Sequence, residues 1–386
     1  MKVGVAKEIA PGERRVALVP ESGEKLRAAG ISVFVERGAG TEASFTDDAY
    51  AEAGAKIVTT PTLYSTCDVI LRIGRPTPAE TKHTRPGQVI IGLLAPLLDA
   101  PAMAEFAARD LTMVSLDAIP RTLSRAQTMD ALSSQANVAG YKAVLVAADA
   151  FGRYFPLLTT SAGTAKPANV LILGVGVAGL QAIATARRLG AQVKAYDVRA
   201  ETREQAESLG AQFVTLKSAI DGAGSGGYAR ELTQEEQAAQ QAELNEVIGH
   251  QDVVITTAQV PGRRPPVLVT AEAVAAMRAG SIIVDMAASD LGGNCELSRP
   301  GKMVLTSNGV QIHAPLNLPA SMPTGASQFY SRNISNLLFT FVKDGELQFN
   351  FEDEVTAATV ITHGGKVVQE AVKKLLEPAK RGGAKA

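Results

Sequence analysis

Residues 170–197 read VLILGVGVAGLQAIATARRLGAQVKAYD, and this stretch decides the fold of the second half of the chain. The apolar run 170–173 predicts a buried strand that leads directly into the glycine turn GVGVAG at 174–179. A helical segment follows, and a second predicted strand over 192–196 ends at Asp197. A strand, a GxGxxG turn, a helix and a second strand ending in an acid together form the fingerprint of a dinucleotide-binding unit.

The three glycines of this turn have different predicted roles. Gly174 permits the tight turn, Gly176 lets a pyrophosphate approach the backbone, and Gly179 lets the helix pack closely on the strand. The pyrophosphate would lie against the unpaired amide groups at the helix N-terminus. A glycine turn in an ordinary α/β unit is the alternative interpretation, but the register of strands, helix and terminal acid favours a nucleotide site.

The terminal acid predicts which nucleotide binds. Asp197 follows Gly179 by 18 residues, which is where an acid meets the hydroxyl groups of the adenosine ribose. A carboxylate there accepts hydrogen bonds from the 2′-hydroxyl and repels a 2′-phosphate, which favours NAD(H) over NADP(H). Arg199, two residues further on, is the one neighbour in the sequence that would suit a 2′-phosphate.

The composition of the 386 residues is that of an α/β enzyme with more than one domain. The chain is 46% hydrophobic, and its formal net charge of −1 argues against nucleic acid as the main partner. Cys67 and Cys295 are too few and too far apart for a disulfide framework, which favours a reducing cytoplasm. The N-terminus lacks a signal-peptide pattern, and the uncharged stretch 167–186 is the strand, turn and helix of the fingerprint rather than a membrane span.

Strand-like and helical segments alternate through the first third of the chain as well, without a glycine fingerprint. This alternation predicts a second parallel sheet, so the expected fold class is α/β with two Rossmann-like parallel-sheet domains separated by a cleft. Residues 327–342 are predicted to form an amphipathic helix, and residues 355–368 a β-hairpin. The tail lacks enough apolar residues for a third core. We therefore expect an NAD-binding domain, residues 131–321, inserted into a first domain of residues 1–130 and 322–386.

A second group of polar residues lies at the expected domain junction, in the segment PRTLSRAQTMD at 120–130. Such junctions commonly form binding clefts. A long helix is predicted from Ser124 onward, and Gln127, Asp130 and Ser134 would then share one face of it. The equally acceptable alternative is a capped, solvated helix start with Ser124 as the N-cap.

Neither a metal site nor a nucleophile motif is visible in the sequence. The four histidines do not share metal-ligand spacing with cysteine or acidic residues, so we expect no metal. No G-x-S-x-G turn occurs. The histidines are His83, His250, His313 and His363.

Four strings together make the chain similar to one family, and these strings are PRTLSRAQTMDALSSQANVAGYKAV, GVGVAGLQAIATARRLGAQVKAYDVR, GGYARE and GGNCELSRPG. Over nearly its whole length the chain resembles the NAD(H)-binding alpha subunit of proton-translocating nicotinamide nucleotide transhydrogenase. The resemblance implies a cytoplasmic homodimer that binds NAD(H). It also implies docking on a separate NADP(H)-binding subunit and on membrane-spanning subunits, which would make the chain peripheral to the inner membrane.

The resemblance assigns roles to residues of the segment 120–130 and of the glycine-rich parts of the chain. Arg121, Gln127 and Asp130 would surround the nicotinamide and its ribose, and Gln127 would face the incoming NADP(H). Tyr228, at the end of a glycine-rich run, matches a mobile loop that closes over the nucleotide and excludes water. The candidate catalytic residues are Arg121, Gln127, Asp130, Ser133 and Tyr228. The candidate cofactor-binding residues are Gly174, Gly176, Val177, Gly179, Asp197, Val198, Arg199, Gly227, Thr257 and Ala258.

The related alanine dehydrogenase family provides the main alternative, a self-contained NAD-dependent amino-acid dehydrogenase. The catalytic lysine of that family falls at Gly74 here, and its histidine falls near Leu94 or Ala95. Oxidative deamination needs a positioned acid or base, whereas hydride exchange between two nicotinamides moves no proton. In this alternative Arg15 and Arg72 could bind a substrate carboxylate, or both could be solvated arginines. A nucleotide sensor without chemistry is a third possibility, although sensing alone does not need a lid that excludes water.

The leading hypothesis is that this chain holds NADH and presents its C4 hydrogen to NADP⁺ on another subunit. Catalysis would come from proximity and orientation of the two rings. Any coupling to proton translocation would come from the membrane subunits, through changes in binding or docking. The isolated chain is then expected to bind NADH without turnover.

Overall fold

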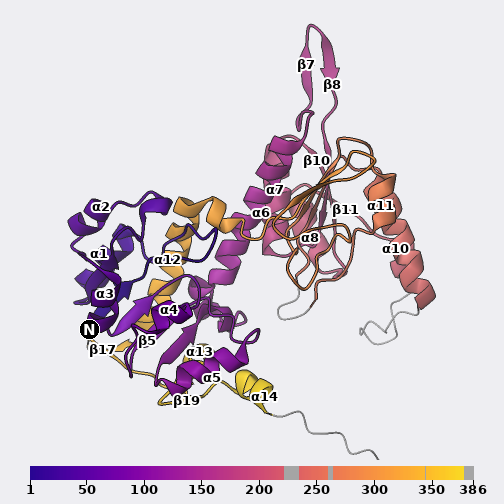
Figure 1. Ribbon diagram of the computed structural model, residues 1–386. Coiled ribbons are helices and arrows are strands. Elements are labelled where there is room, and N and C mark those ends of the chain that lie inside the picture. The colour runs from indigo at the N-terminus through magenta and orange to yellow at the C-terminus, as the bar shows by residue number, and fades with distance from the viewer. Residues whose placement is uncertain (221–233, 260–263, 344, 378–386) are drawn as a thin grey trace, which may run out of the picture. The chain divides into compact units, whose positions relative to one another are not determined.

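The computed structural model describes residues 1–220, 234–259, 264–343 and 345–377. Contacts within the chain divide it into two compact units, each built around one sheet. Unit 1 consists of Met1–Gln135 and Pro319–Ala386, and unit 2 consists of Ala136–Leu318. In Figure 1 the indigo start of the chain and its yellow end therefore belong to the same unit.

The sheet of unit 1 contains six parallel strands in the order β3-β2-β1-β4-β5-β6. This is the strand order of doubly wound dinucleotide-binding folds, and the winding reverses between β1 and β4. The strands are β1 (Lys2–Val5), β2 (Ser32–Glu36), β3 (Lys56–Val58), β4 (Val69–Leu71), β5 (Val89–Gly92) and β6 (Thr112–Ser115).

Both faces of this sheet are buried, because successive side chains of a strand point to opposite sides. In β4, Val69 and Leu71 pack into one apolar core, whereas Ile70 packs into the other. Strands buried on both faces read as continuous apolar runs, which is the pattern seen in the sequence. The helices of this unit are α1 (Pro20–Ala28), α2 (Asp47–Glu52), α3 (Thr60–Thr66), α4 (Pro78–Thr81), α5 (Ala100–Ala108), α12 (Pro323–Thr340), α13 (Glu354–Thr359) and α14 (Glu370–Leu376).

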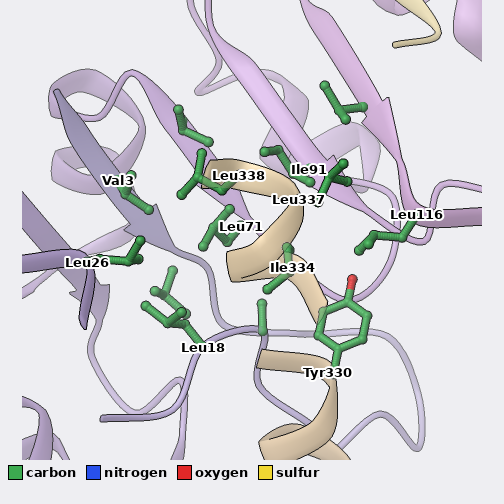
Figure 2. Packing of buried hydrophobic residues seen from close by; sticks show 14 of the residues in the cluster. Val3, Leu18, Leu26, Leu71, Ile91, Leu116, Tyr330, Ile334, Leu337 and Leu338 are labelled. Carbon is green, nitrogen blue, oxygen red and sulfur yellow. The ribbon is translucent and has the colours of Figure 1, made fainter. Parts of the chain in front are cut away.

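Helix α12 packs its apolar stripe against the sheet of unit 1 (Figure 2). The stripe points toward Leu71 and Ile91 and recurs at helical spacing. It consists of Tyr330, Ile334, Leu337 and Leu338, all fully buried. The predicted amphipathic helix is therefore confirmed, and it begins at Pro323, a residue suited to the first helical turn.

The predicted hairpin over 355–368 is correct only at its end. Residues Glu354–Thr359 form α13, because Asp353 caps that helix by accepting hydrogen bonds from the N–H groups of Val355 and Thr356. The hairpin is short and consists of β18 (Thr362–His363) and β19 (Lys366–Val367). The short elements that complete unit 1 are η1 (Thr41–Ala43), η2 (Leu116–Ala118), η3 (Ser124–Met129), η4 (Pro319–Ser321), β16 (Val342–Lys343) and β17 (Glu346–Leu347).

Unit 2 repeats the same winding in a seven-stranded sheet of order β11-β10-β9-β12-β13-β15-β14. All neighbours are parallel except β14 and β15 at one edge. Its strands are β9 (Asn169–Leu173), β10 (Gln192–Tyr196), β11 (Gln212–Phe213), β12 (Val253–Thr256), β13 (Ile282–Asp285), β14 (Met303–Leu305) and β15 (Gln311–His313). The predicted α/β class with two Rossmann-like parallel sheets is thus confirmed.

Helices cover both faces of the second sheet. Apolar residues of α6 and α7 pack on one face, and apolar residues of α10 and α11 pack on the other. The helices are α6 (Ala131–Ala150), which begins in unit 1, α7 (Val177–Arg188), α8 (Thr202–Ser208), α9 (Lys217–Ile220), α10 (Gln234–Gly249) and α11 (Ala271–Ala276). A separate hairpin, β7 (Leu158–Thr160) with β8 (Gly163–Ala165), extends away from this sheet (Figure 1). Within the described ranges, no helix is both long and apolar enough to span a bilayer.

Candidate functional site

The glycine turn lies where the winding of unit 2 reverses. Gly174 directly follows β9 and Thr257 directly follows β12, and these two strands are neighbours in the sheet. The Thr257 hydroxyl donates a hydrogen bond of 2.9 Å to the Gly174 carbonyl, which joins the two strand ends. Ligands of doubly wound sheets bind in the crevice at this switch point, at the carboxyl ends of the strands.

Two glycines of the turn are required by the backbone conformation and close packing of the chain, independently of any ligand. Gly174 has φ +99°, and a Cβ there would lie 2.7 Å from the Thr257 hydroxyl. A Cβ on Gly179 would lie 1.9 Å from the Gly174 carbonyl oxygen, so α7 approaches the strand end as closely as a glycine allows. The neighbouring helix α6 is equally close, since a Cβ on Gly140 would lie 2.1 Å from the Ala178 carbonyl oxygen.

The middle glycine leaves space for a ligand. In the described part of the chain no atom beyond Gly176 and its two adjoining residues lies within 4 Å of a Cβ built on Gly176. Gly176 is also the N-cap of α7, and no described side chain caps that helix end. Val177, the first residue of α7, is 42% exposed beside it. An open backbone at an uncapped helix N-terminus fits a pyrophosphate group.

Asp197 ties the second strand to this turn. Its carboxylate accepts hydrogen bonds from the Val175 N–H at 2.7 Å and from the Arg199 N–H at 2.9 Å. The Arg199 guanidinium also donates to both carboxylate oxygens, each at 3.0 Å. Burial raises the pKa of Asp197, but the hydrogen bonds from Arg199 and Val175 outweigh burial and hold the pKa below the usual value. Val198 between them is 82% exposed and provides an apolar surface.

A buried polar network that the sequence reasoning missed forms the opposite side of the turn. Asn294 accepts a hydrogen bond from the Ala258 N–H at 3.0 Å and donates to the Ala258 carbonyl at 2.9 Å. The fully buried carboxylate of Asp285 accepts hydrogen bonds from the backbone N–H of Asn294 and the hydroxyls of Thr256 and Ser298. The sequence does contain a signal for this network: Asp285 ends an apolar strand, and Gly292-Gly293 follow it.

Residues 120–130, the polar segment of unit 1, do not form the predicted helix. The helix does not begin at Ser124, because Ser124–Met129 is the 3-10 helix η3 and α6 begins only at Ala131. The backbone of Asp130, with ψ 86°, leaves the helical conformation and separates η3 from α6. Gln127, Asp130 and Ser134 therefore do not share one α-helical face. Ser124 is not an N-cap, since Leu123 precedes η3 without a side-chain cap.

Asp130 caps α6 in place of Ser124. Its carboxylate accepts hydrogen bonds from the Ser133 N–H at 2.9 Å and from the Ser133 hydroxyl at 2.5 Å. The Arg121 guanidinium lies 3.7 Å from the same carboxylate. The structure thus brings Arg121, Asp130 and Ser133 together, whereas the Gln127 side chain lies exposed on η3. Gly227 and Tyr228 lie outside the described residues.

Comparison with known proteins places these features in one family. The family "Alanine dehydrogenase/PNT, N-terminal domain" matches residues 4–139, and "Alanine dehydrogenase/PNT, C-terminal domain" matches residues 143–370. The chain is 44% identical over 383 residues to the first part of the NAD(P) transhydrogenase alpha subunit of Rhodospirillum rubrum, and the match covers 96% of this chain and 99% of that protein. The chain belongs to the NAD(P) transhydrogenase alpha-subunit family. The resemblance predicted from the four sequence strings is confirmed.

Solved structures agree with this membership. The crystal structure of transhydrogenase from Sinorhizobium meliloti has a TM-score of 0.84 and 41% identity, and the match covers 96% of this chain and 100% of that one. Alanine dehydrogenase of Bacillus subtilis is a more distant relative, 28% identical over 97% of this chain and 94% of that protein.

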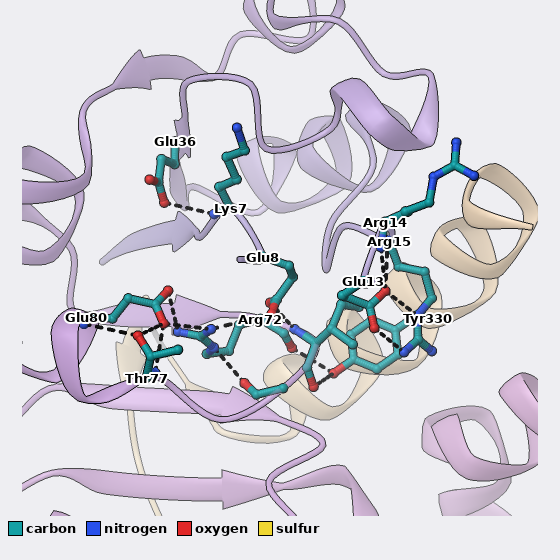
Figure 3. A network of polar contacts seen from close by, with 12 residues as sticks. Lys7, Glu8, Glu13, Arg14, Arg15, Glu36, Arg72, Thr77, Glu80 and Tyr330 are labelled. Carbon is teal, nitrogen blue, oxygen red and sulfur yellow. Dashed lines mark hydrogen bonds and ion pairs between the residues drawn. The ribbon is translucent and has the colours of Figure 1, made fainter. Parts of the chain in front are cut away.

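In this transhydrogenase-family chain the switch point of unit 1 is filled by internal ion pairs (Figure 3). Arg72 is 1% exposed, and its guanidinium lies 3.1 Å from Glu80 and 3.4 Å from Glu8. It also donates to the Gly74 carbonyl at 2.6 Å and to the Tyr64 hydroxyl at 3.1 Å. Burial raises the pKa of Glu8, although Arg72 opposes that effect.

Arg15 is also buried and paired. It donates to both carboxylate oxygens of Glu13, at 2.8 and 2.6 Å, and to the Gln135 side-chain oxygen at 2.7 Å. The interpretation of Arg15 and Arg72 as solvated arginines is therefore wrong. A substrate carboxylate would have to displace a buried internal carboxylate at either guanidinium. Within the described residues, no group of three or more His, Cys, Asp or Glu side chains is arranged to hold a metal ion.

Proposed function

We propose that this chain is the NAD(H)-binding subunit of an NAD(P)⁺ transhydrogenase. Hydride would pass directly between NADH held here and NADP⁺ held on a partner subunit. The observation that carries the proposal is the glycine turn of unit 2, with its open backbone at Gly176 and an acid at the end of the second strand. A bound nicotinamide supplies the hydride chemistry, and the protein contributes binding, orientation and exclusion of water.

The nucleotide roles follow the geometry of the turn. Gly174, Gly176, Val177 and Gly179 would hold the pyrophosphate at the N-terminus of α7. Asp197 and Val198 would hold the adenosine end, and Arg199 would lie beside them, bonded to Asp197. Thr257 and Ala258 would line the crevice from the neighbouring strand. The exposed apolar surface of Val198 and the acceptor oxygens of Asp197 support this assignment.

Arg121, Gln127 and Asp130 would orient the nicotinamide and its ribose, with Ser133 beside Asp130. The close grouping of three of these residues supports the assignment. Gln127 would face the NADP(H) partner, and its exposure on η3 is what such a contact requires. Gly227 and Tyr228 would belong to a loop that closes over the nucleotide. No acid or base is needed, because proximity and orientation of two rings suffice for hydride exchange.

The partners would be an NADP(H)-binding subunit and membrane-spanning subunits, which would place the chain in the cytoplasm at the inner membrane. Proton translocation would be coupled through them, by changes in docking or binding on this chain. The Rhodospirillum rubrum relative, named as the first part of an alpha subunit, supports a complex divided among several chains.

We propose a homodimer in which the hairpin β7–β8 contacts a second copy. The hairpin is exposed along nearly its whole length, and Tyr154 and Leu157 at its base are 59% and 61% exposed. An isolated two-stranded hairpin is marginal in water, whereas exchange of an element between two copies covers it at low cost. Leu157→Asp should therefore yield monomers in analytical ultracentrifugation, whereas Leu305→Asp on the exposed edge strand β14 should not. A monomeric wild-type chain would contradict the dimer.

The decisive experiment measures hydride transfer from NADPH to an NAD⁺ analogue. The purified chain would be assayed alone and with the isolated NADP(H)-binding component of a transhydrogenase. Turnover only in the mixture is expected. Turnover by the chain alone would contradict the proposed split site. L-alanine-dependent reduction of NAD⁺ would instead support the self-contained dehydrogenase. Tight NADH binding without turnover in any mixture would favour a sensor.

A further inference from the structure

One side chain of α12 holds the polar segment of unit 1 from both sides. The Asn333 amide group donates a hydrogen bond of 2.8 Å to the Thr128 carbonyl. Its side-chain oxygen accepts a hydrogen bond of 2.7 Å from the Ser134 hydroxyl. Asp130 lies between Thr128 and Ser134 in the chain, so Asn333 bridges η3 and α6 across the break at Asp130.

The helix that carries Asn333 is held in place by its buried apolar side chains. Asn333 is 8% exposed, and its neighbour Ile334 is fully buried in the core of unit 1 (Figure 2). The apolar stripe of α12 packs on the sheet, which leaves the face with Asn333 directed at η3. Asn336, one turn further along this face, donates to the same Thr128 carbonyl at 3.2 Å, in a more exposed position.

Backbone hydrogen bonds within the segment hold it only weakly, and its other anchors are Asn336 and the buried side chains of Ala126 and Met129. A 3-10 helix has poorer hydrogen-bond geometry than an α-helix, and the backbone leaves the helical region at Asp130. Gln127 sits one residue before the anchored carbonyl of Thr128, and Asp130 sits two residues after it. The anchored backbone therefore carries both residues, and the Asp130 carboxylate is held further by Ser133.

We propose that Asn333 is a positioning residue for hydride transfer, because it fixes the backbone on both sides of Asp130. This inference rests on the proposed function, in which Gln127 and Asp130 orient the nicotinamide. Asn333 itself would not touch the nucleotide. Small misplacements at a distance from the chemistry can lower a rate about 100-fold, so loss of this bridge should affect kcat far more than nucleotide affinity.

The test compares Asn333→Ala with Ser331→Ala. Ser331 lies on the same helix, is fully buried, and accepts a hydrogen bond of 3.0 Å from the Val19 N–H, away from the segment. Both variants lose one buried polar group of α12. In the mixture with the NADP(H)-binding component, Asn333→Ala should lower kcat by about 10- to 100-fold, with the KM for NADH changed less than about threefold and Ser331→Ala near wild type. A double-mutant cycle of Asn333→Ala with Ser134→Ala should be non-additive.

A second readout does not depend on activity. Amide hydrogen exchange of residues 126–131 should be about tenfold faster in Asn333→Ala than in wild type or Ser331→Ala, as expected for the loss of a buried hydrogen bond. Unchanged exchange would overturn the bridge whatever the activity. Faster exchange with an unchanged kcat would overturn the positioning role, and equal losses of kcat in both variants would reduce Asn333 to a structural residue. A wild-type chain without partner-dependent turnover would refute the proposed function, with the exchange result still deciding the bridge.

Discussion

The carboxylate of Asp197 accepts a hydrogen bond of 2.7 Å from the backbone N–H of Val175. The acid that would select the ribose therefore also holds the second residue of the glycine turn. The remaining acceptor sites of Asp197 face Arg199, whose guanidinium donates to both of its oxygens. A ribose diol would need the same oxygens, so nucleotide binding at this site requires Arg199 to move or to share them.

Removal of the Arg199 side chain should make the site more selective. In Arg199→Ala the oxygens of Asp197 become available to the ribose, and the only described cation bonded to Asp197 is lost. The guanidinium of this ion pair is half-exposed although the carboxylate is buried. Ion pairs with such exposure contribute about 0–1 kcal/mol, so NADH should bind up to about fivefold more tightly. NADPH should bind more weakly, since its 2′-phosphate would meet an uncompensated carboxylate. Fluorescence titrations with both nucleotides measure this ratio, and weaker binding of NADH would show that Arg199 holds the adenosine directly.

Asp197 should also contribute to stability in a pH-dependent way. Its pKa in the folded chain lies below the ordinary value of 3.8, so its ionised form is favoured by folding. The contribution is fully present above that ordinary value and is lost as the pH falls through the folded pKa. Urea unfolding of wild type and Asp197→Asn should therefore differ at pH 7, and the two stabilities should converge as the pH falls below 3.8. A difference that grows on acidification would contradict the lowered pKa.

Substitutions at two glycines of the turn should have different effects on stability and on NADH affinity. Gly176→Ala should unfold at the same temperature as wild type, because no described atom beyond the adjoining residues lies within 4 Å of the added Cβ. A pyrophosphate, however, could no longer approach the backbone. We expect its NADH affinity to fall at least about 100-fold, which corresponds to about 2.7 kcal/mol.

Gly179→Ala is the matched variant, because its added Cβ would lie 1.9 Å from the Gly174 carbonyl oxygen. It should be destabilised by about 1–3 kcal/mol, the usual cost of overpacking. Calorimetry and NADH titration measure the two effects. Equal loss of stability in both variants would contradict the separate roles.

Arg72 should be essential for the stability of unit 1. Arg72→Leu would leave Glu8 and Glu80 buried beside each other without their shared cation, which typically costs about 3–5 kcal/mol. Arg75→Leu is a suitable control, since it removes an ion pair with Asp99 that is 34% and 41% exposed and should cost less than about 1 kcal/mol. Chemical unfolding followed by circular dichroism distinguishes them. A similar small effect of both substitutions would indicate that the buried carboxylates become protonated instead.

Local sequence patterns determined the strands and the helix around the glycine turn. The apolar runs around the glycine turn predicted β9, α7 and β10, because strands buried on both faces need continuous apolar residues. Gly174 and Gly179 were recognisable because only glycine permits a positive φ and so close an approach to the backbone. The absence of a lysine at Gly74 was equally visible in the sequence.

Only the tertiary structure decided where the remaining polar groups go. Periodicity favoured one helix through Gln127 and Asp130, but Asp130 ends one helix and caps the next, and Asn333 from a distant helix bridges the break. Arg15 and Arg72 read as free cations, and yet both are buried against carboxylates or amides brought from other segments. A sequence records which groups carry charge, whereas burial and pairing depend on contacts between residues far apart in the chain, and those contacts exist only once the sheets and helices have packed.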